Sequence, residues 1–160
     1  MKILSKMKVV FLLLLTMLCC TNGPQPSVEQ EVEEQKQESM MPDKINITID
    51  GETLSVILVS NDATKALVAA LEESPITYTA SDYGGFEKVG PLGRSLPANN
   101  SRITTGAGDV ILYSGNQIVL FYGSNSWSYT RIGKMEYASL EALKSFLKAG
   151  EGDIRVTLSL

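Results

Sequence analysis

The sequence contains no histidine and only two cysteines, so several common kinds of active site cannot be built from it. The cysteines are Cys19 and Cys20, and residues 44–160 contain none. Without an imidazole base or a thiolate nucleophile, this region cannot form the common hydrolase triads or zinc sites. We therefore expect no metal and no cofactor. We also expect the region to fold without disulfide bonds.

The chain also lacks a cluster of basic residues. Residues 44–160 carry ten Lys and Arg residues against twelve Asp and Glu residues, spread along the sequence. Proteins that bind nucleic acid place positive side chains against the phosphate backbone. We therefore do not expect nucleic acid as a partner of this nearly neutral region, whose length allows one domain.

Residues 1–20 are typical of a lipoprotein signal peptide. Three lysines precede the apolar run at residues 9–15, which is too short to cross a bilayer as a helix. The following MLCC segment resembles a lipobox, and Cys20 is the better candidate for lipidation because small Cys19, rather than bulky Leu18, would then precede the cut. We predict a protein anchored by lipid to a bacterial membrane in the cell envelope. The alternative is a secreted protein whose two cysteines are incidental.

Residues 21–43 are predicted to form a disordered acidic tether. This segment is rich in Glu, Gln, Pro and Ser, and it contains one lysine against six acidic residues. So few apolar side chains cannot offset the entropy lost on ordering. A solvated spacer is the favoured interpretation, and binding through the acidic run is the alternative.

Residues 44–160 are predicted to be mainly β. Isoleucines alternate with polar residues at 45–49, a second alternating run follows the Asp50-Gly51 turn, and residues 153–160 alternate again. In the middle, apolar runs at 110–113 and 118–122 flank Gly115-Asn116, a pattern typical of a tight hairpin. The second run then breaks at residues 124–128, which hold the only tryptophan in the chain.

Two short amphipathic helices interrupt the strands. The first is capped by Asn61 or Asp62 and carries apolar residues at helical spacing, and the second begins after Ser139. Each helix has one apolar stripe, which must pack against another apolar surface to be removed from water. We expect the two helices to cover the open ends of a barrel of seven or eight strands.

The segment at residues 81–101 has neither a strand nor a helix pattern and is predicted to be a long loop. Loops of this length in small domains are usually functional or disordered. Tyr83, Phe86 and Leu92 provide apolar anchors, which argues against disorder. We expect this loop to fold beside the break at residues 124–128.

The order of these motifs resembles the bacterial cyclophilin-like domain family. The resemblance is carried by KINITIDG, SDYGGFEKVGPLGRSLP, GAGDVILYSGNQIVLFYGSNSWSYTRIGK and the final IRVTLSL, and it spans residues 44–160. It implies a closed eight-stranded cyclophilin-like β-barrel with a helix at each end. Family members are named for their fold rather than for a proven activity.

The resemblance also raises the question of peptidyl-prolyl isomerase activity. In cyclophilins an arginine polarises the prolyl peptide bond beside an apolar pocket that also holds a Gln and a His. This chain has no histidine and lacks the cyclophilin Phe-Met-x-Gln run. The candidate donors are Arg94, Arg102 and Arg131, of which Arg131 is the choice if the protein is an isomerase of the envelope.

The favoured function is non-catalytic binding of a small molecule or short peptide. Aromatic side chains with a few convergent polar groups suit such a ligand, and the predicted lining residues are Tyr83, Glu87, Lys88, Asn125, Trp127, Tyr129 and Arg131. The structural alternative places Tyr83 and Trp127 in the core and pairs Glu87 with Arg131 or Lys88. A purely structural interaction module is a third possibility. The sequence does not indicate an oligomeric state.

Overall fold

Nine strands and two helices form the computed structural model, which describes residues 41–160. The predicted signal peptide with Cys20, and residues 21–40 of the predicted tether, lie outside the described residues. The strands are β1 Lys44–Ile49, β2 Glu52–Leu58, β3 Ile76–Tyr83, β4 Glu87–Pro91, β5 Ser101–Thr104, β6 Asp109–Tyr113, β7 Gln117–Phe121, β8 Ser126–Met135 and β9 Ile154–Ser159. The two helices are α1 Asp62–Glu73 and α2 Leu140–Phe146.

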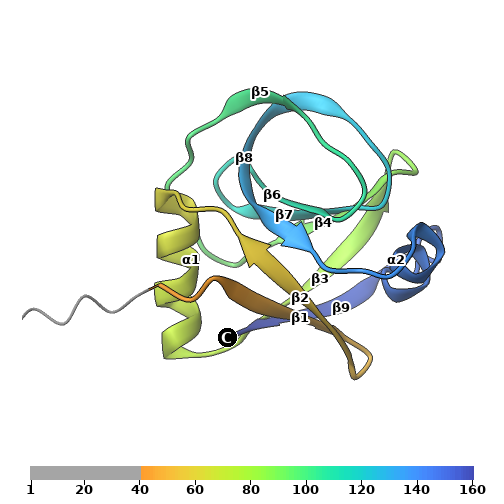
Figure 1. Ribbon diagram of the computed structural model, residues 1–160, viewed down its shortest axis with the longest axis horizontal. Helices are drawn as coiled ribbons and strands as arrows, with labels where there is room; N and C mark the ends of the chain where they lie inside the picture. The colour runs from red at the N-terminus through yellow and green to blue at the C-terminus, as the bar shows by residue number, and fades with distance from the viewer. Residues whose placement is uncertain (1–40) are drawn as a thin grey trace, which may run out of the picture. The chain divides into compact units, whose positions relative to one another are not determined.

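Eight of the strands close into an antiparallel barrel. Their order is β2-β1-β9-β3-β4-β7-β6-β8, and pairing between β2 and β8 closes the ring. The ninth strand, β5, pairs only with β8 and lies outside the ring (Figure 1). The prediction of a mainly β fold with a closed eight-stranded barrel and two short helices is confirmed.

The prediction of a long loop at residues 81–101 is wrong in its first half. Strand β3 runs on to Tyr83, and β4 returns after a tight turn in which Gly84 and Gly85 both have positive φ angles. The turn was hidden because β4 contains Glu87 and Lys88, which a pattern of apolar residues assigns to the surface although both are buried. This strand, and not the short strand at 101–104, completes the barrel.

The central hairpin consists of β6 and β7, with Tyr113 paired to Gln117. Its turn lies one residue earlier than predicted, since the positive φ angles belong to Ser114 and Gly115. The Asn116 N–H donates to the Tyr113 carbonyl, which closes the turn.

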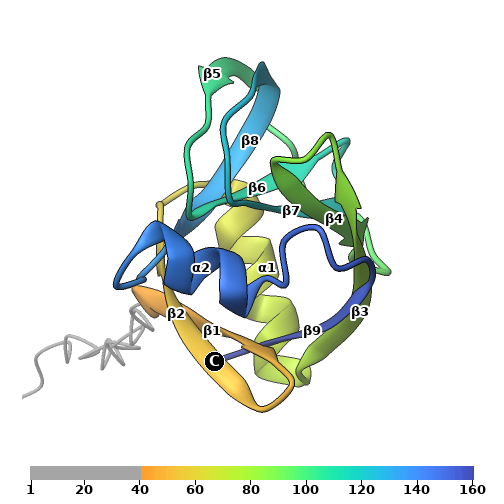
Figure 2. The ribbon, with the colours of Figure 1, turned by 90° about the vertical axis from the view of Figure 1, so that its right-hand side faces the viewer.

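Both helices pack on the barrel core. Asn61 caps α1 by accepting a hydrogen bond from the Thr64 N–H, and Ser139 caps α2 by accepting from the Ala142 N–H. Figure 1 shows the two helices at opposite ends of the barrel, as expected, and Figure 2, viewed from the α2 side, shows α2 in front of α1. Leu67 of α1 and Leu143 of α2 join the same core cluster as the barrel strands. Within residues 41–160, neither helix has the length and apolarity needed to cross a bilayer.

Closure of the barrel depends on the absence of a side chain at Gly133. This residue pairs with Leu58 where β8 meets β2. A Cβ atom at Gly133 would lie 2.3 Å from the Ile57 carbonyl oxygen and 2.8 Å from a Val56 methyl group. Because the first of these contacts is with backbone, the two strands would have to separate to accept even alanine.

We expect Gly133→Ala to lower the free energy of unfolding by about 1–3 kcal/mol, the usual cost of overpacking. The matched control is Gly106→Ala, because a Cβ at Gly106 meets no atom within 4 Å. The control should change stability by less than about 0.5 kcal/mol. Urea denaturation of the two variants measures the difference, and equal midpoints would contradict this account of closure.

Candidate functional site

Strand β8 belongs to two sheets. Its C-terminal half pairs with β6 and β2 in the barrel, while Ser126 to Tyr129 pair with β5. The register with β6 shifts between Val110 and Ile111, so the strand bends where it leaves the barrel. We call β5 together with residues 126–129 the arm. Figure 2 shows the arm rising from the barrel on the side of β6 and β7.

The arm covers the outer face of the barrel sheet. Along β7, Ile118 and Leu120 point into the barrel core, whereas Val119 and Phe121 belong to a second apolar cluster on the other face. This second cluster also contains Ile111 of β6 and Tyr129 of the arm. Strands buried on both faces read as continuous apolar runs, which is why 110–113 and 118–122 show no alternation.

A cavity of about 760 Å³ lies between the arm, the outer face of the sheet and the β3–β4 turn. This volume is in the range of small-molecule sites. Five of the seven predicted lining residues border it: Tyr83, Glu87, Asn125, Trp127 and Tyr129. The other residues that border it are Gly84, Phe86, Val89, Tyr113, Gln117 and Val119. The Tyr83 segment and the Trp127 segment therefore lie at one cavity, as expected.

The cavity walls are largely aromatic. The rings of Tyr83, Phe86, Phe121, Tyr129 and Tyr113 form a continuous series in which successive centroids are 5.9–6.5 Å apart. Four of these rings border the cavity, whereas Phe121 is fully buried in the second apolar cluster and links Phe86 to Tyr129. Edge-to-face and stacked contacts between aromatic rings at these distances are favourable, so they hold the rings in place. The result is a wall of ring faces and edges that is assembled before any ligand arrives.

Two aromatic residues of the cavity keep much of their surface in solvent. Tyr83 is 63% exposed and Trp127 is 56% exposed. Exposure of this size excludes the alternative that they are core residues. Large apolar side chains exposed at the edge of a concave site are typical of a ligand-binding surface.

Glu87 is the one charged residue that borders the cavity. It is only 6% exposed, and its buried Oε2 atom has no hydrogen-bond partner. Burial disfavours the ionised form and raises the pKa of the Glu87 carboxyl to about 7. The alternative that Glu87 pairs with Arg131 or Lys88 is wrong, because both of those cations are engaged elsewhere.

Lys88 does not border the cavity, contrary to the prediction, because neighbouring residues of a strand point to opposite faces. Its side chain is fully buried on the barrel side, where the ammonium group binds the Asp82 carboxylate at 2.7 Å and donates to the Gly152 carbonyl. Burial raises the pKa of Asp82, but hydrogen bonds from Lys88 and from the Gly150 and Gly152 N–H groups outweigh it and lower the pKa to about 2. This pair fixes the segment after α2 to β3.

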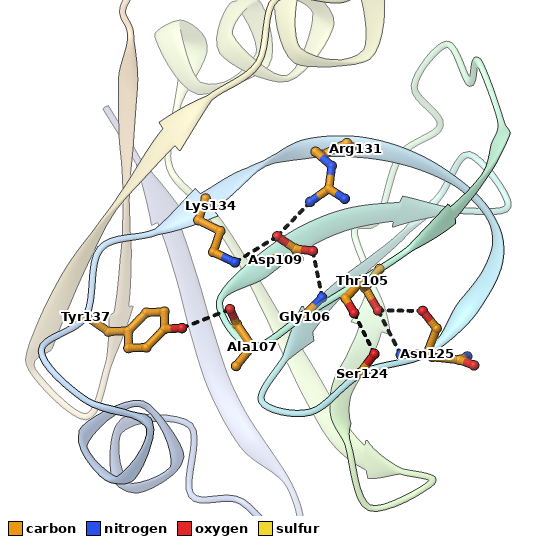
Figure 3. Close-up of polar contacts among 9 residues, drawn as sticks. All are labelled: Thr105, Gly106, Ala107, Asp109, Ser124, Asn125, Arg131, Lys134 and Tyr137. Atoms are coloured by element: carbon orange, nitrogen blue, oxygen red, sulfur yellow. Dashed lines mark hydrogen bonds and ion pairs between the residues drawn. The ribbon is translucent and has the colours of Figure 1, made fainter.

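Arg131 also lies away from the cavity, contrary to the prediction. Its guanidinium group is 2.6 Å from the Asp109 carboxylate, which also pairs with Lys134 at 3.3 Å and accepts from the Gly106 N–H (Figure 3). Burial raises the pKa of Asp109, but Arg131 and Gly106 outweigh it and hold the pKa below its usual value. Arg131 thus stabilises the bend of β8, and Asp109 closes the turn that precedes β6 by accepting from the Gly106 N–H.

A second polar cluster fixes the base of the arm. Thr105 and Asn125 exchange hydrogen bonds through the Thr105 hydroxyl and both backbones, and Ser124 donates to the Thr105 carbonyl (Figure 3). The Asn125 amide also donates to the Tyr129 hydroxyl at 3.0 Å. The break in the apolar run at 124–128 is therefore an ordered turn that orients Tyr129 in the cavity wall.

A family model described as the cyclophilin-like family matches residues 47–159. The chain belongs to the cyclophilin-like family. Among solved structures, it is similar to the solution structure of a hypothetical protein from Archaeoglobus fulgidus, with 18% sequence identity and a TM-score of 0.53. The match covers 77% of this chain and 98% of that one, and it shows a shared fold. No protein with a curated description matches the chain significantly.

In this cyclophilin-like domain, sequence reasoning missed five side chains of the cavity: Phe86, Val89, Tyr113, Gln117 and Val119. Two signals in the sequence point to them. The Gly84-Gly85 pair is typical of a hairpin turn, and a hairpin there places 87 and 89 on one face. The continuous apolar runs of β6 and β7 require a cover on both faces. Within residues 41–160, no group of His, Cys, Asp or Glu side chains comes together in a way that could hold a metal ion.

Proposed function

We propose that this cyclophilin-like domain binds a small molecule or short peptide without chemical conversion, while a lipid holds the protein to a bacterial membrane. The single observation that carries the binding proposal is the aromatic cavity of about 760 Å³ beside Trp127. Its walls are ordered by the arm, and its lining combines apolar faces with three polar side chains, Glu87, Gln117 and Asn125. Such a composition gives both contact area and orientation to a bound ligand.

Two alternatives receive less support. Prolyl isomerisation in cyclophilins uses an arginine beside the proline pocket. None of the residues that border this cavity is an arginine, and Arg131 is paired with Asp109. A purely structural module needs no cavity beside Trp127, and one is present. Binding is thus the function that this geometry supports best.

The only tryptophan of the chain provides the test of binding. Trp127 is 56% exposed at the cavity, so a ligand that covers it should shift its fluorescence emission. We expect a library of small molecules and short peptides, titrated into the purified full-length protein, to contain compounds that shift this emission saturably. Val89→Phe, which enlarges a side chain of the cavity wall, should weaken the binding of ligands that contact this wall at least about tenfold, a cost typical of overpacking.

The matched control for this experiment is Ile57→Phe, because Ile57 is an exposed apolar residue of β2 that does not border the cavity. It should leave ligand affinity unchanged. Compounds that bind Val89→Phe as tightly as the original protein, or a library without any binder, would contradict the proposal.

The membrane anchor has a separate test. If the thiol of Cys20 carries the lipid, Cys20→Ala should move the protein from the membrane fraction to the soluble fraction of a bacterial host, because a lipid chain supplies the membrane affinity. Cys19→Ala is the matched control and should leave the protein in the membrane fraction. Immunoblots of fractionated cells measure both, and a Cys20→Ala protein that sediments with membranes would refute the anchor.

A further inference from the structure

The cavity contains an acid with no base to neutralise it. Glu87 is the only charged side chain among the eleven residues that border it. The nearest basic residue along the chain, Lys88, is committed to Asp82 on the opposite face of β4, and Arg131 is committed to Asp109. A carboxyl group that is buried without a partner is costly for a protein, and each such group needs an explanation.

The surroundings of Glu87 suit a positive charge. Five aromatic residues border the same cavity: Tyr83, Phe86, Tyr113, Trp127 and Tyr129. The faces of such rings attract cations, and the attraction is stronger where water is excluded. Gln117 and Asn125 add polar groups, of which the Asn125 amide is already bonded to Tyr129.

We propose that the cavity recognises ligands through a protonated amine, whose N–H groups pair with the Glu87 carboxylate while the aromatic rings surround the adjoining carbon atoms. This inference rests on the proposed binding function and names the chemical class of its ligand. An amine that carries N–H groups fits better than a quaternary ammonium, because the buried Glu87 Oε2 atom has no hydrogen-bond donor. A charge-assisted hydrogen bond of this kind is among the strongest in proteins.

The titratable groups around Glu87 are few. From β3, β6 and β8, the cavity receives only the tyrosine hydroxyls of Tyr83, Tyr113 and Tyr129. Burial raises the pKa of Tyr129, so this hydroxyl stays neutral near pH 7. Strand β7 contributes Gln117 and Val119, which do not titrate. The Lys88–Asp82 pair and Tyr122, which donates to Asp82, lie on the other face of β4.

The proposal fixes the direction of the pH dependence. The Glu87 carboxyl of the free protein has a pKa of about 7 and must be ionised to pair with an amine. An alkylammonium group stays protonated below about pH 9, as lysine does. Affinity should therefore rise about tenfold from pH 6 to pH 8, as the ionised fraction of Glu87 rises. A ligand that accepts a hydrogen bond from the protonated carboxyl would show the opposite slope.

The test uses three probes of similar shape with the full-length protein: 2-phenylethylamine, 2-phenylethanol and 2-phenylacetamide. Calorimetry and Trp127 emission measure their binding at pH 6, 7 and 8. We expect the amine to bind at least about tenfold tighter than the alcohol at pH 8, which is the usual effect of a hydrogen bond between charged groups. Binding of the amine at pH 7 should release protons.

The decisive variant is Glu87→Gln, which keeps the shape of the side chain. It should weaken binding of the amine about tenfold or more at pH 8 and leave binding of the alcohol unchanged. Unchanged binding of the alcohol also shows that the cavity is intact. The control is Glu72→Gln, which removes a carboxylate charge at an exposed position of α1. It should change neither the affinity for the amine nor the affinity for the alcohol.

Equal affinities for amine and alcohol, an unchanged affinity in Glu87→Gln, or tighter binding of the acetamide that weakens as pH rises would each overturn the proposal. The library titration with Val89→Phe separates the two levels of inference. If it finds only neutral ligands, amine recognition fails while the binding function stands. If it finds no ligand at all, both fail.

Discussion

The structure depends on one strand that serves two sheets. The C-terminal half of β8 closes the barrel against β2, and its N-terminal residues carry the arm over the outer face of the same barrel. The bend between these halves is held by the Arg131–Asp109 ion pair and by Asn61, whose amide donates to the Arg131 carbonyl. Because the cap of α1 is the same Asn61, the first helix, the barrel seam and the arm are positioned by one connected set of contacts.

Strand β4 contains two adjacent buried charged residues that have different roles. Lys88 and Glu87 follow one another in β4, so their side chains lie on opposite faces. Lys88 is satisfied by Asp82 and the Gly152 carbonyl, whereas the buried Glu87 Oε2 atom has no partner. A buried charge that is paired contributes to structure, and one that is left unpaired under an aromatic surface is a candidate for ligand recognition.

The sequence predicts most of the barrel because its strands follow simple rules. Alternating isoleucines mark β1, the terminal alternation marks β9, and the caps at Asn61 and Ser139 mark both helices. Strand β4 could not be predicted in this way. Lys88 is buried because it pairs with Asp82 and the Gly152 carbonyl, and Glu87 is buried on the face that the arm covers.

The candidate site was predicted only in part. Tyr83 and Trp127 were correctly expected at one cavity, because aromatic residues amid small polar ones indicate an exposed recognition surface. The directions of Lys88 and Arg131 were missed for different reasons. The face of Lys88 follows from the hairpin at Gly84-Gly85, which was not recognised, because neighbours in a strand point to opposite faces. The direction of Arg131 depends on Asp109, which a turn distant in the sequence brings to it.

The central claim is that the arm lies over the outer face of the barrel and removes the Glu87 carboxyl from water. A carbon-detected NMR titration of the glutamate carboxyl groups of the full-length protein, assigned with Glu87→Gln, tests it most directly. The account predicts that the pKa of Glu87 is about 7. A pKa near its usual value of 4.5 would show that the carboxyl is solvated, and it would contradict the claim.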